Sequence, residues 1–408
     1  MRKIYLLSIS FLLCLSVAGQ VDAKFGKGIK FMSPDETFSM KFSLRIQPLF
    51  TTNFRDFEKF DQPALNEIQM MIRRARLKFD GHVYDKKWTY KFELAFGNRN
   101  IGGINEFTNM GARIILDAVI KYQFHKNYSV WFGQTKLPGN RERVVSSANL
   151  QFVDRHVVNS RFNLDRDMGF QLRGKHKVGN MPILTAFALS MGEGRNITET
   201  NLGGLEYTFR AEVLPLGAFS SKKGHYSEAD LDREPKPKLA IGASYDFNDR
   251  AVRARGNQGS FILPNNTEGE RIVYTNSLHT LWIDLIFKYK GWSFMSEYAQ
   301  RSAEKSPLVF NEDDGSLYGS KFYTGNGINF QAGYLFKNNI ELAGRTSFMR
   351  PEVGIANQYN QYTFVVSKYI VGHSLKVQSD ISYSDYSAIN GETVADPLMF
   401  RFQVEIGL

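Results

Sequence analysis

The chain has 408 residues, of which 43% are hydrophobic and 14% aromatic, yet its mean hydropathy is −0.32. This composition excludes a disordered chain, because disordered chains lack bulky apolar residues. After about the first twenty residues no apolar run is long enough for a transmembrane helix. The formal net charge of +10 would suit an anionic partner. A high aromatic content with a polar average is typical of strands in which apolar and polar residues alternate.

The first segment predicts an exported protein. A basic N-terminus precedes an apolar run over 4–18, and a signal-peptidase-like site ends at Ala23. We therefore expect residues 1–23 to be a cleaved signal peptide and residues 24–37 to be a short periplasmic N-terminal segment. An uncleaved membrane anchor is the alternative. The single cysteine, Cys14, lies in the apolar run, so the exported chain would have no disulfide and no thiolate metal site.

From residue 38 onward the sequence alternates with a period of two. Segment 38–50 has apolar residues at every second position and mainly Ser, Lys, Arg or Gln between them. This pattern predicts a strand with one apolar and one polar face, of about the length that a tilted strand needs to cross a membrane. The same alternation recurs at 71–83, 88–96, 116–124, 205–213, 239–247, 281–289, 328–336, 340–348, 375–383 and 400–408, and more weakly at 128–136, 183–191 and 362–370.

Short and long connections alternate between these segments. Turn-like connections such as 290–291 alternate with loops such as 137–165 and 248–277. Outer-membrane barrels have short periplasmic turns, long extracellular loops and an even number of strands. We count roughly sixteen strands and predict an all-β fold, a transmembrane antiparallel β-barrel over 38–408. Connection 215–237 falls on the side where the other connections are short turns, but it is long. It is therefore either an unusual periplasmic segment or a sign that the strand count is wrong there.

A large soluble β-sandwich is the structural alternative to this barrel. Sandwich strands usually have about five or six residues, whereas many of the present segments are longer. Aromatic residues also stand at the segment ends, as expected at the two membrane interfaces. They are Phe38, Phe50, Trp88, Phe96, Phe124, Tyr289 and Trp292. These features favour a barrel in contact with lipid, in the outer membrane of a Gram-negative bacterium.

Connection 137–166 combines arginines with apolar residues that a free extracellular loop would not need. The arginines are Arg141, Arg143, Arg155, Arg161 and Arg166. We therefore expect this segment to fold into the barrel as a constriction loop. Rings of basic residues select anions, and the planar guanidinium suits phosphate. The alternative is that the arginines only hold the loop in place by pairing with Glu142, Asp154, Asp165 and carboxylates of the wall.

A barrel of about sixteen strands has a water-filled lumen. The candidate pore-lining and anion-binding residues are Arg45, Arg74, Arg76, Lys78, Lys121, Arg141, Arg143, Arg155 and Arg161. Acids such as Glu93, Asp117 and Asp284 face the same lumen, so its charge is mixed. We expect a passive channel for small hydrophilic solutes, biased toward anions such as phosphate. A general or oligosaccharide-preferring channel is the alternative, because Trp131 and Trp282 also fall on the lumen face.

Other classes of function have weaker support in the sequence. None of the seven histidines lies in a recognisable catalytic frame, so we do not expect an enzyme. No metal-ligand spacing and no glycine-rich phosphate loop is present, so we expect no metal ion and no cofactor. The basic charge could bind nucleic acid, but an exported chain of alternating strands has no use for that, and we expect no nucleic-acid partner.

Six stretches carry a family resemblance through their order and spacing. They are 72–81, 117–122, 132–138, 152–155 with 166–169, 297–298 and 372–378. Through them the mature chain resembles the phosphate-selective porin O and P family over essentially its whole length. The resemblance implies a homotrimer of sixteen-stranded barrels that pass anions, in some members phosphate or polyphosphate. Two features depart from the family: Leu408 ends the chain where barrels usually end in Phe, and the lumen lacks a dense ladder of lysine and arginine.

Overall fold

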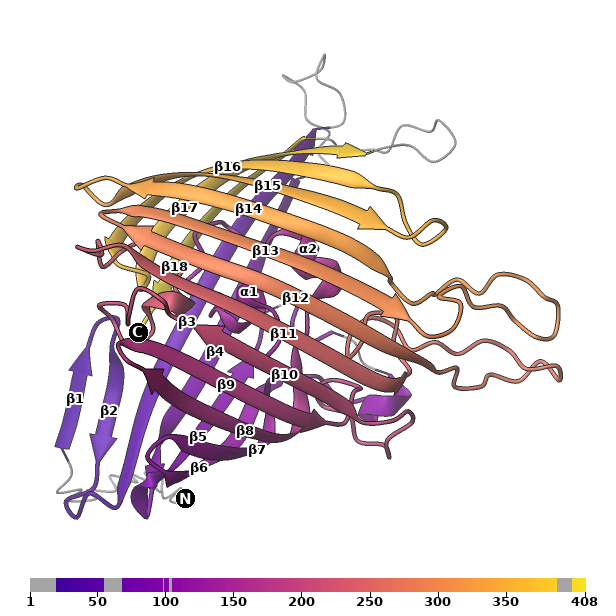
Figure 1. The fold of residues 1–408 in the computed structure, drawn as a ribbon, viewed down its shortest axis with the longest axis horizontal. Helices are drawn as coiled ribbons and strands as arrows, with labels where there is room; N and C mark the ends of the chain where they lie inside the picture. The colour runs from indigo at the N-terminus through magenta and orange to yellow at the C-terminus, as the bar shows by residue number, and fades with distance from the viewer. Residues whose placement is uncertain (1–19, 55–67, 98, 103–104, 387–397) are drawn as a thin grey trace, which may run out of the picture.

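The computed structural model describes residues 20–54, 68–97, 99–102, 105–386 and 398–408 (Figure 1). The strands are β1 (Gln20–Lys24), β2 (Gly28–Met32), β3 (Phe38–Phe54), β4 (Ile68–Val83), β5 (Asp85–Ala95), β6 (Ile115–His125), β7 (Tyr128–Lys136), β8 (Arg166–Val178), β9 (Met181–Ser190), β10 (Glu206–Val213), β11 (Lys238–Ala251), β12 (Asn276–Tyr289), β13 (Trp292–Ala303), β14 (Gly325–Leu335), β15 (Ile340–Pro351), β16 (Tyr359–Val371), β17 (Leu375–Tyr386) and β18 (Leu398–Gly407). The short helices are η3 (Glu106–Thr108), α1 (Arg141–Val144), α2 (Val157–Phe162) and η4 (Gly224–Tyr226).

Sixteen strands, β3 to β18, form a closed antiparallel barrel (Figure 1). Each strand pairs with its neighbours in sequence, and β18 closes the barrel on β3, with Leu398 opposite Phe54 and Gly407 opposite Arg45. Closure satisfies the backbone groups that an open sheet would expose at its edges, which is why a barrel can cross lipid. The predicted fold class of about sixteen antiparallel strands is confirmed.

Strands β1 and β2 form a hairpin outside the barrel, at the side of β3. β2 pairs with the first part of β3, with Ile29 opposite Phe42, while β18 pairs with the rest of β3. β1 runs through Ala23, the expected cleavage site. Most of the expected signal peptide, residues 1–19, lies outside the described residues, and nothing tests the periplasmic location of segment 24–37, so both stay predictions.

The two faces of the strands differ in burial as the alternation predicts. In β12, Leu281 and Ile283 are 37% and 50% exposed, whereas Trp282 and Asp284 are 0% and 2% exposed. The apolar side chains thus point outward toward lipid, and the polar side chains point into the barrel. No helix among the described residues is long and apolar enough to cross a membrane.

The connections distinguish the two ends of the barrel (Figure 1). The turn between β12 and β13 consists of Lys290 and Gly291, whose φ angles are 47° and 93°. Two-residue hairpin turns with positive φ at both central residues match the right-handed twist of the two strands that they join. The opposite end carries the long loops, for example 252–275 between β11 and β12. By this plan the short turns face the periplasm and the long loops face the exterior.

Two connections, one from each end, fold into the barrel. The constriction loop (residues 137–165) joins β7 to β8 and carries α1 and α2, and α2 packs against β13, β14 and β15. The periplasmic insert (residues 214–237) joins β10 to β11 and carries η4. The strand count around the insert is therefore right, and the long connection on the periplasmic side is a real segment.

Candidate functional site: the lumen and its two inserted segments

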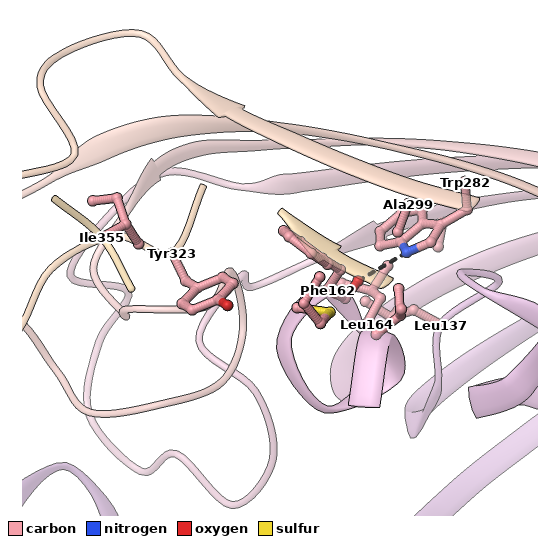
Figure 2. Close-up of a cluster of buried hydrophobic side chains, with 10 residues drawn as sticks. Leu137, Phe162, Leu164, Trp282, Ala299, Tyr323 and Ile355 are labelled. Carbon is pink, nitrogen blue, oxygen red and sulfur yellow. Dashed lines mark hydrogen bonds between the residues drawn. The ribbon is translucent and has the colours of Figure 1, made fainter. Parts of the chain in front are cut away.

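Apolar packing fixes the constriction loop to one side of the lumen. Phe162 and Leu164 of the loop are 0% and 1% exposed and pack in one cluster with Trp282 of β12. Figure 2 shows Trp282 directed at the loop, where its indole Nε1 donates a hydrogen bond to the Phe162 carbonyl oxygen at 2.8 Å. The apolar residues of the loop therefore serve as anchors, as the sequence predicts, and Trp282 is covered.

A buried ion cluster holds the same loop beside α1. The Nε of Arg141 donates to Oδ1 of Asp284 at 2.7 Å, and its Nη2 lies 3.1 Å from Oε2 of Glu212. Arg210 donates to both oxygens of Asp284, at 2.7 and 3.0 Å. The Arg141 side chain is 0% exposed. Arg141 therefore lies between the loop and the wall, and it presents no surface to a solute.

A second clamp holds the far end of the loop to β4. Asp154 accepts hydrogen bonds from Nη2 of Arg73 at 2.7 Å and from Nη2 of Arg74 at 2.9 Å. Two consecutive residues reach the lumen because the register of β3 and β4 shifts between Gln47 and Pro48, and a bulge leaves one residue unpaired. Strict alternation misses Arg73 for this reason.

Backbone carbonyls of the loop are bonded by the opposite wall. Nζ of Lys376 donates to the carbonyl oxygens of Ala148 and Leu150 at 3.0 and 2.9 Å. Gln151 donates through Nε2 to Oε1 of Glu341 at 2.8 Å. These wall partners come from β15 and β17, and the Asp284 cluster comes from β10 and β12, so the loop covers the wall formed by β10–β17. We call this side the covered wall.

The periplasmic insert meets the constriction loop inside the barrel. The Gln151 backbone N–H donates to Oε2 of Glu228 at 2.8 Å, and Nη1 of Arg141 donates to the His225 carbonyl oxygen at 2.8 Å. Lys288 of β12 donates to the carbonyl oxygens of Gly224 and Ala229. The insert is therefore fixed both to the wall and to the loop.

Burial sets the protonation of two groups in these inserted segments. Burial raises the pKa of Glu142 in α1 well above its usual value, and the neighbouring Glu228 carboxyl raises it further. Burial lowers the pKa of His225 in the insert to about 4. At neutral pH His225 is therefore uncharged, whereas burial beside Glu228 disfavours the charged form of Glu142.

Strands β4–β8 form a second wall, which we call the cationic wall. Its partly exposed inward cations include Arg76, Lys78, Lys91, Lys121 and Arg173, whereas Arg74 and Arg166 on the same strands are buried. The side chains of Arg76, Lys78 and Lys91 are 13%, 36% and 23% exposed. The side chains of Arg210 and Lys376 on the covered wall are 5% and 0% exposed. The accessible basic groups are therefore concentrated on one side of the lumen.

The structure separates the predicted site residues into three groups. Arg45, Arg74 and Arg141 are buried, and Arg45 donates to Ser147 of the loop at 2.7 Å. Arg76 pairs with Glu93 at 3.1 Å and Lys78 pairs with Asp80 at 2.6 Å, both on the cationic wall. Lys121 stands over the Trp131 ring, with Nζ 3.9 Å from the ring centroid.

The remaining predicted residues are arginines of the constriction loop. Arg143 donates from Nε to Oδ1 of Asp165 at 2.7 Å. Arg155 donates to the carbonyl oxygens of Glu142 and Val145 at 2.8 and 2.9 Å, so it braces the loop. Arg161 is exposed and lies 5.4 Å from the Tyr323 ring centroid. Their proposed contact with anions stays a prediction.

Several basic residues of the lumen are absent from the predicted set, among them Arg73, Lys91, Arg173 and Lys223. The alternation already places Lys91 and Arg173 on the polar face, so the signal for these two was present. Lys223 belongs to the periplasmic insert. The insert has no periodic pattern, so the sequence does not predict where it lies. Among the described residues no group of three or more His, Cys, Asp or Glu side chains could hold a metal ion.

Comparisons with known proteins agree with this architecture. The trimer form of in-vitro folded OmpT, an outer membrane protein of Vibrio cholerae, is similar at a TM-score of 0.53 and 11% identity, over 91% of this chain and 100% of that one. The outer membrane channel DcaP of Acinetobacter baumannii gives 0.52 and 11%, over 93% and 99%. The high-pH structure of OprB from Pseudomonas putida gives 0.55 and 9%, over 90% and 94%. At these identities the likeness shows the fold.

A match at the level of sequence gives the family. No curated protein sequence matches the chain. The sequence model that describes the phosphate-selective porins O and P matches residues 45–279, which include β4–β11 and both inserted segments. The fold, the inserted loop and this match agree on an outer-membrane channel. The chain belongs to the phosphate-selective porin O and P family.

Proposed function

We propose that this outer-membrane channel passes small hydrophilic solutes by passive diffusion and favours anions, phosphate among them. The observation that carries the proposal is the difference between the two walls. The covered wall is buried under the constriction loop, whereas the cationic wall keeps partly exposed lysines and arginines. Solutes that diffuse through the remaining lumen would therefore meet mainly positive charge.

The strength of the bias follows from elementary electrostatics. Two opposite charges about 4 Å apart attract by roughly 1 kcal/mol in water and about 4 kcal/mol at an effective dielectric constant of 20. Some cations on this wall are already neutralised, since Arg76 pairs with Glu93 and Lys78 pairs with Asp80. The proposal therefore depends on a net excess of cations, and we expect a preference for anions rather than strict selectivity.

The reversal potential of the purified channel in a KCl gradient tests this proposal. Replacement of Arg76, Lys78 and Lys91 by glutamine should move the reversal potential toward cation preference at about 0.1 M salt, where the screening length is about 10 Å. At about 1 M salt the shift should largely disappear, because the screening length falls to about 3 Å. An unchanged reversal potential at low salt would contradict the anion preference and leave a general channel.

A matched control removes the same charge outside the lumen. Arg250, Arg271 and Lys305 are exposed on the strand ends and loops of the extracellular end. Their replacement by glutamine lowers the net charge equally and should leave the reversal potential near its original value. Equal shifts in both triple variants would assign the effect to overall charge rather than to the cationic wall.

We also propose that the channel assembles as a homotrimer and does not act as an enzyme. The family resemblance supports the trimer, and a trimer form is known for the structural neighbour OmpT. Native mass measurement in mild detergent should give three times the mature chain mass, and the same sample after boiling should give a single chain. A monomer before heating would exclude the trimer and leave the channel proposal intact.

A further inference from the structure

One indole on the cationic wall lies against two cations from different strands. Trp131 of β7 is paired directly with Lys121 of β6, whose Nζ lies 3.9 Å from the ring centroid. Arg173 of β8 is paired with Ser129, and its Cζ lies 4.2 Å from the same centroid. The Trp131 Nε1 donates to the Ser129 hydroxyl at 3.0 Å, which fixes the ring.

These cations have no carboxylate of their own. Arg173 donates from Nε and Nη2 to Gln171, a neutral amide. The charges that act most strongly on Lys121 include three cations, Lys91, Arg173 and Lys223, and one acid, Asp117. Among the residues that the structure describes, no ion pair within 4.0 Å involves Lys121, Arg173 or Lys223. Positive charge therefore accumulates here without a counter-charge.

Asp117, the acid that acts on Lys121, is already satisfied by other groups. Asp117 lies 2.7 Å from Nζ of Lys91 and 3.1 Å from Nη2 of Arg166, and it accepts a hydrogen bond from Thr135 at 2.8 Å. The indole face offsets part of the positive charge through its quadrupole. That stabilisation keeps the ammonium and the guanidinium in place but does not neutralise them.

Solutes can reach this group of residues. Lys121, Trp131 and Arg173 are half-buried and Lys223 is exposed. Lys121 and Arg173 lie toward the periplasmic ends of β6 and β8, and the insert brings Lys223 from the same end. Burial lowers the pKa of Lys223, the charges of Lys78 and Lys91 lower it further, and the Asp80 carboxylate partly offsets them. An anion at this place would relieve the repulsion among all of these cations.

We propose that Lys121 and Arg173, beside Trp131, form a saturable binding site for an oxyanion group in the periplasmic half of the channel. The proposal rests on the proposed function and deepens it. A guanidinium offers a planar fork of donors and an ammonium offers a compact point charge, a combination that suits the oxygens of phosphate or sulfate.

The same geometry argues against a sugar site at this place. A sugar ring stacks on an open aromatic face, but both cations lie over the Trp131 ring. The other lumen tryptophan, Trp282, is covered by the constriction loop and is 0% exposed. Neither indole therefore offers the platform that an oligosaccharide-preferring channel would need.

Tryptophan fluorescence of the folded, full-length mature channel provides the test, because Trp131 adjoins the site. Trp88→Phe and Trp292→Phe remove the two exposed tryptophans in the background protein, and Trp282 stays as a buried reference. Inorganic phosphate titrated at low ionic strength should change the emission and saturate. Trp131→Phe should abolish the change, which assigns the signal. A linear or absent response would overturn the proposal.

Single substitutions then identify the binding groups. Lys121→Gln and Arg173→Gln should each raise the half-saturating phosphate concentration at least tenfold, while Arg271→Gln on an exposed loop should leave it unchanged. Migration before and after boiling verifies that each barrel is folded. Sulfate should compete and glucose should not. Unchanged half-saturation in both glutamine variants, or competition by glucose, would overturn the proposal.

The outcome is separable from that of the proposed function. An anion-preferring reversal potential without saturable phosphate binding would remove this site and keep the anion preference. Saturable binding in a channel with no anion preference would keep the site and remove the preference. Since fluorescence reports binding without any current, the two results are obtained independently.

Discussion

The two walls of the lumen use charged residues in opposite ways. On the covered wall, Asp284 holds Arg141 and Arg210 in a cluster that is almost fully buried, and the cluster fixes the constriction loop. On the cationic wall, Lys78 and Lys91 keep 36% and 23% of their side-chain surface exposed. Arginines that look equivalent in the sequence therefore hold structure on one side and face water on the other. The difference lies in what covers them.

The largest loss of folding stability should come from removing Asp284, the central acid of the covered wall. Asp284→Ala leaves two guanidiniums buried with Glu212 as the neighbouring acid. Breaking a buried pair by removing one partner costs about 3–5 kcal/mol. We expect a lower unfolding midpoint and, because the loop loses its anchor, a larger single-channel conductance. Asp249→Ala, in an exposed pair with Arg250, should cost less than about 1 kcal/mol. Similar losses in the two variants would contradict the structural role of the Asp284 cluster.

A charged residue on the outer face of the same strand should lower the stability of the barrel by a slightly smaller amount. Ile283 is 50% exposed near the middle of β12, directly beside the buried Trp282 and Asp284. An arginine at a lipid-facing midplane position costs about 2–4 kcal/mol. Ile283→Arg should reduce the yield of heat-modifiable barrel, and Ile283→Leu should not. Normal assembly of the arginine variant would mean that this face does not meet lipid.

Breaking the hydrogen bond between Arg74 and Asp154 should lower the unfolding free energy by an intermediate amount. Hydrogen bonds to charged groups contribute about 1.5–3 kcal/mol, and Arg74 and Asp154 share one at 2.9 Å. Arg74→Gln and Asp154→Asn should each lower the unfolding free energy. Their double variant should lose less than the sum, because both changes remove the same contact. Strict additivity in this cycle would show that the two side chains do not interact.

The smallest expected effect concerns pH and the contact between the two inserted segments. Burial raises the pKa of Glu142 above its ordinary value, so its contribution to stability is full below that ordinary value of 4.5 and is lost as pH rises toward the folded pKa. Conductance noise should therefore increase with pH in the native channel. Glu142→Gln keeps the shape without the titration and should remove this dependence. A native channel that does not respond to pH would contradict the raised pKa of Glu142.

Much of the barrel could be predicted from the sequence, because a period of two is a local property. Segment 128–136 matches β7 at both ends, and 362–370 lies within β16. The bulge between Gln47 and Pro48 breaks that period, and it is the reason Arg73 was missed. The inserted loop was predictable as well, since apolar residues in a loop need a partner surface.

The partners of individual charges were not predictable. Arg141 and Asp284 are 143 positions apart, and their contact depends on where the loop crosses the lumen. A sequence pattern places both residues in the lumen, but it cannot show which side chains are buried by others and which face water. The distinction between structural and water-facing arginines therefore required the three-dimensional arrangement.

The seam between β18 and β3 also bears on how the chain assembles. Gln47 and Gln403 hydrogen-bond across this seam although they are 356 positions apart. Loop-closure entropy rises with chain length, so this pairing is the least favourable one to form early, and we expect it to form last. Until then, β3 and β18 each expose an unpaired edge, which is the kind of surface through which β-proteins aggregate. β2 already occupies the remaining part of the β3 edge, so this strand shortens the edge that awaits closure.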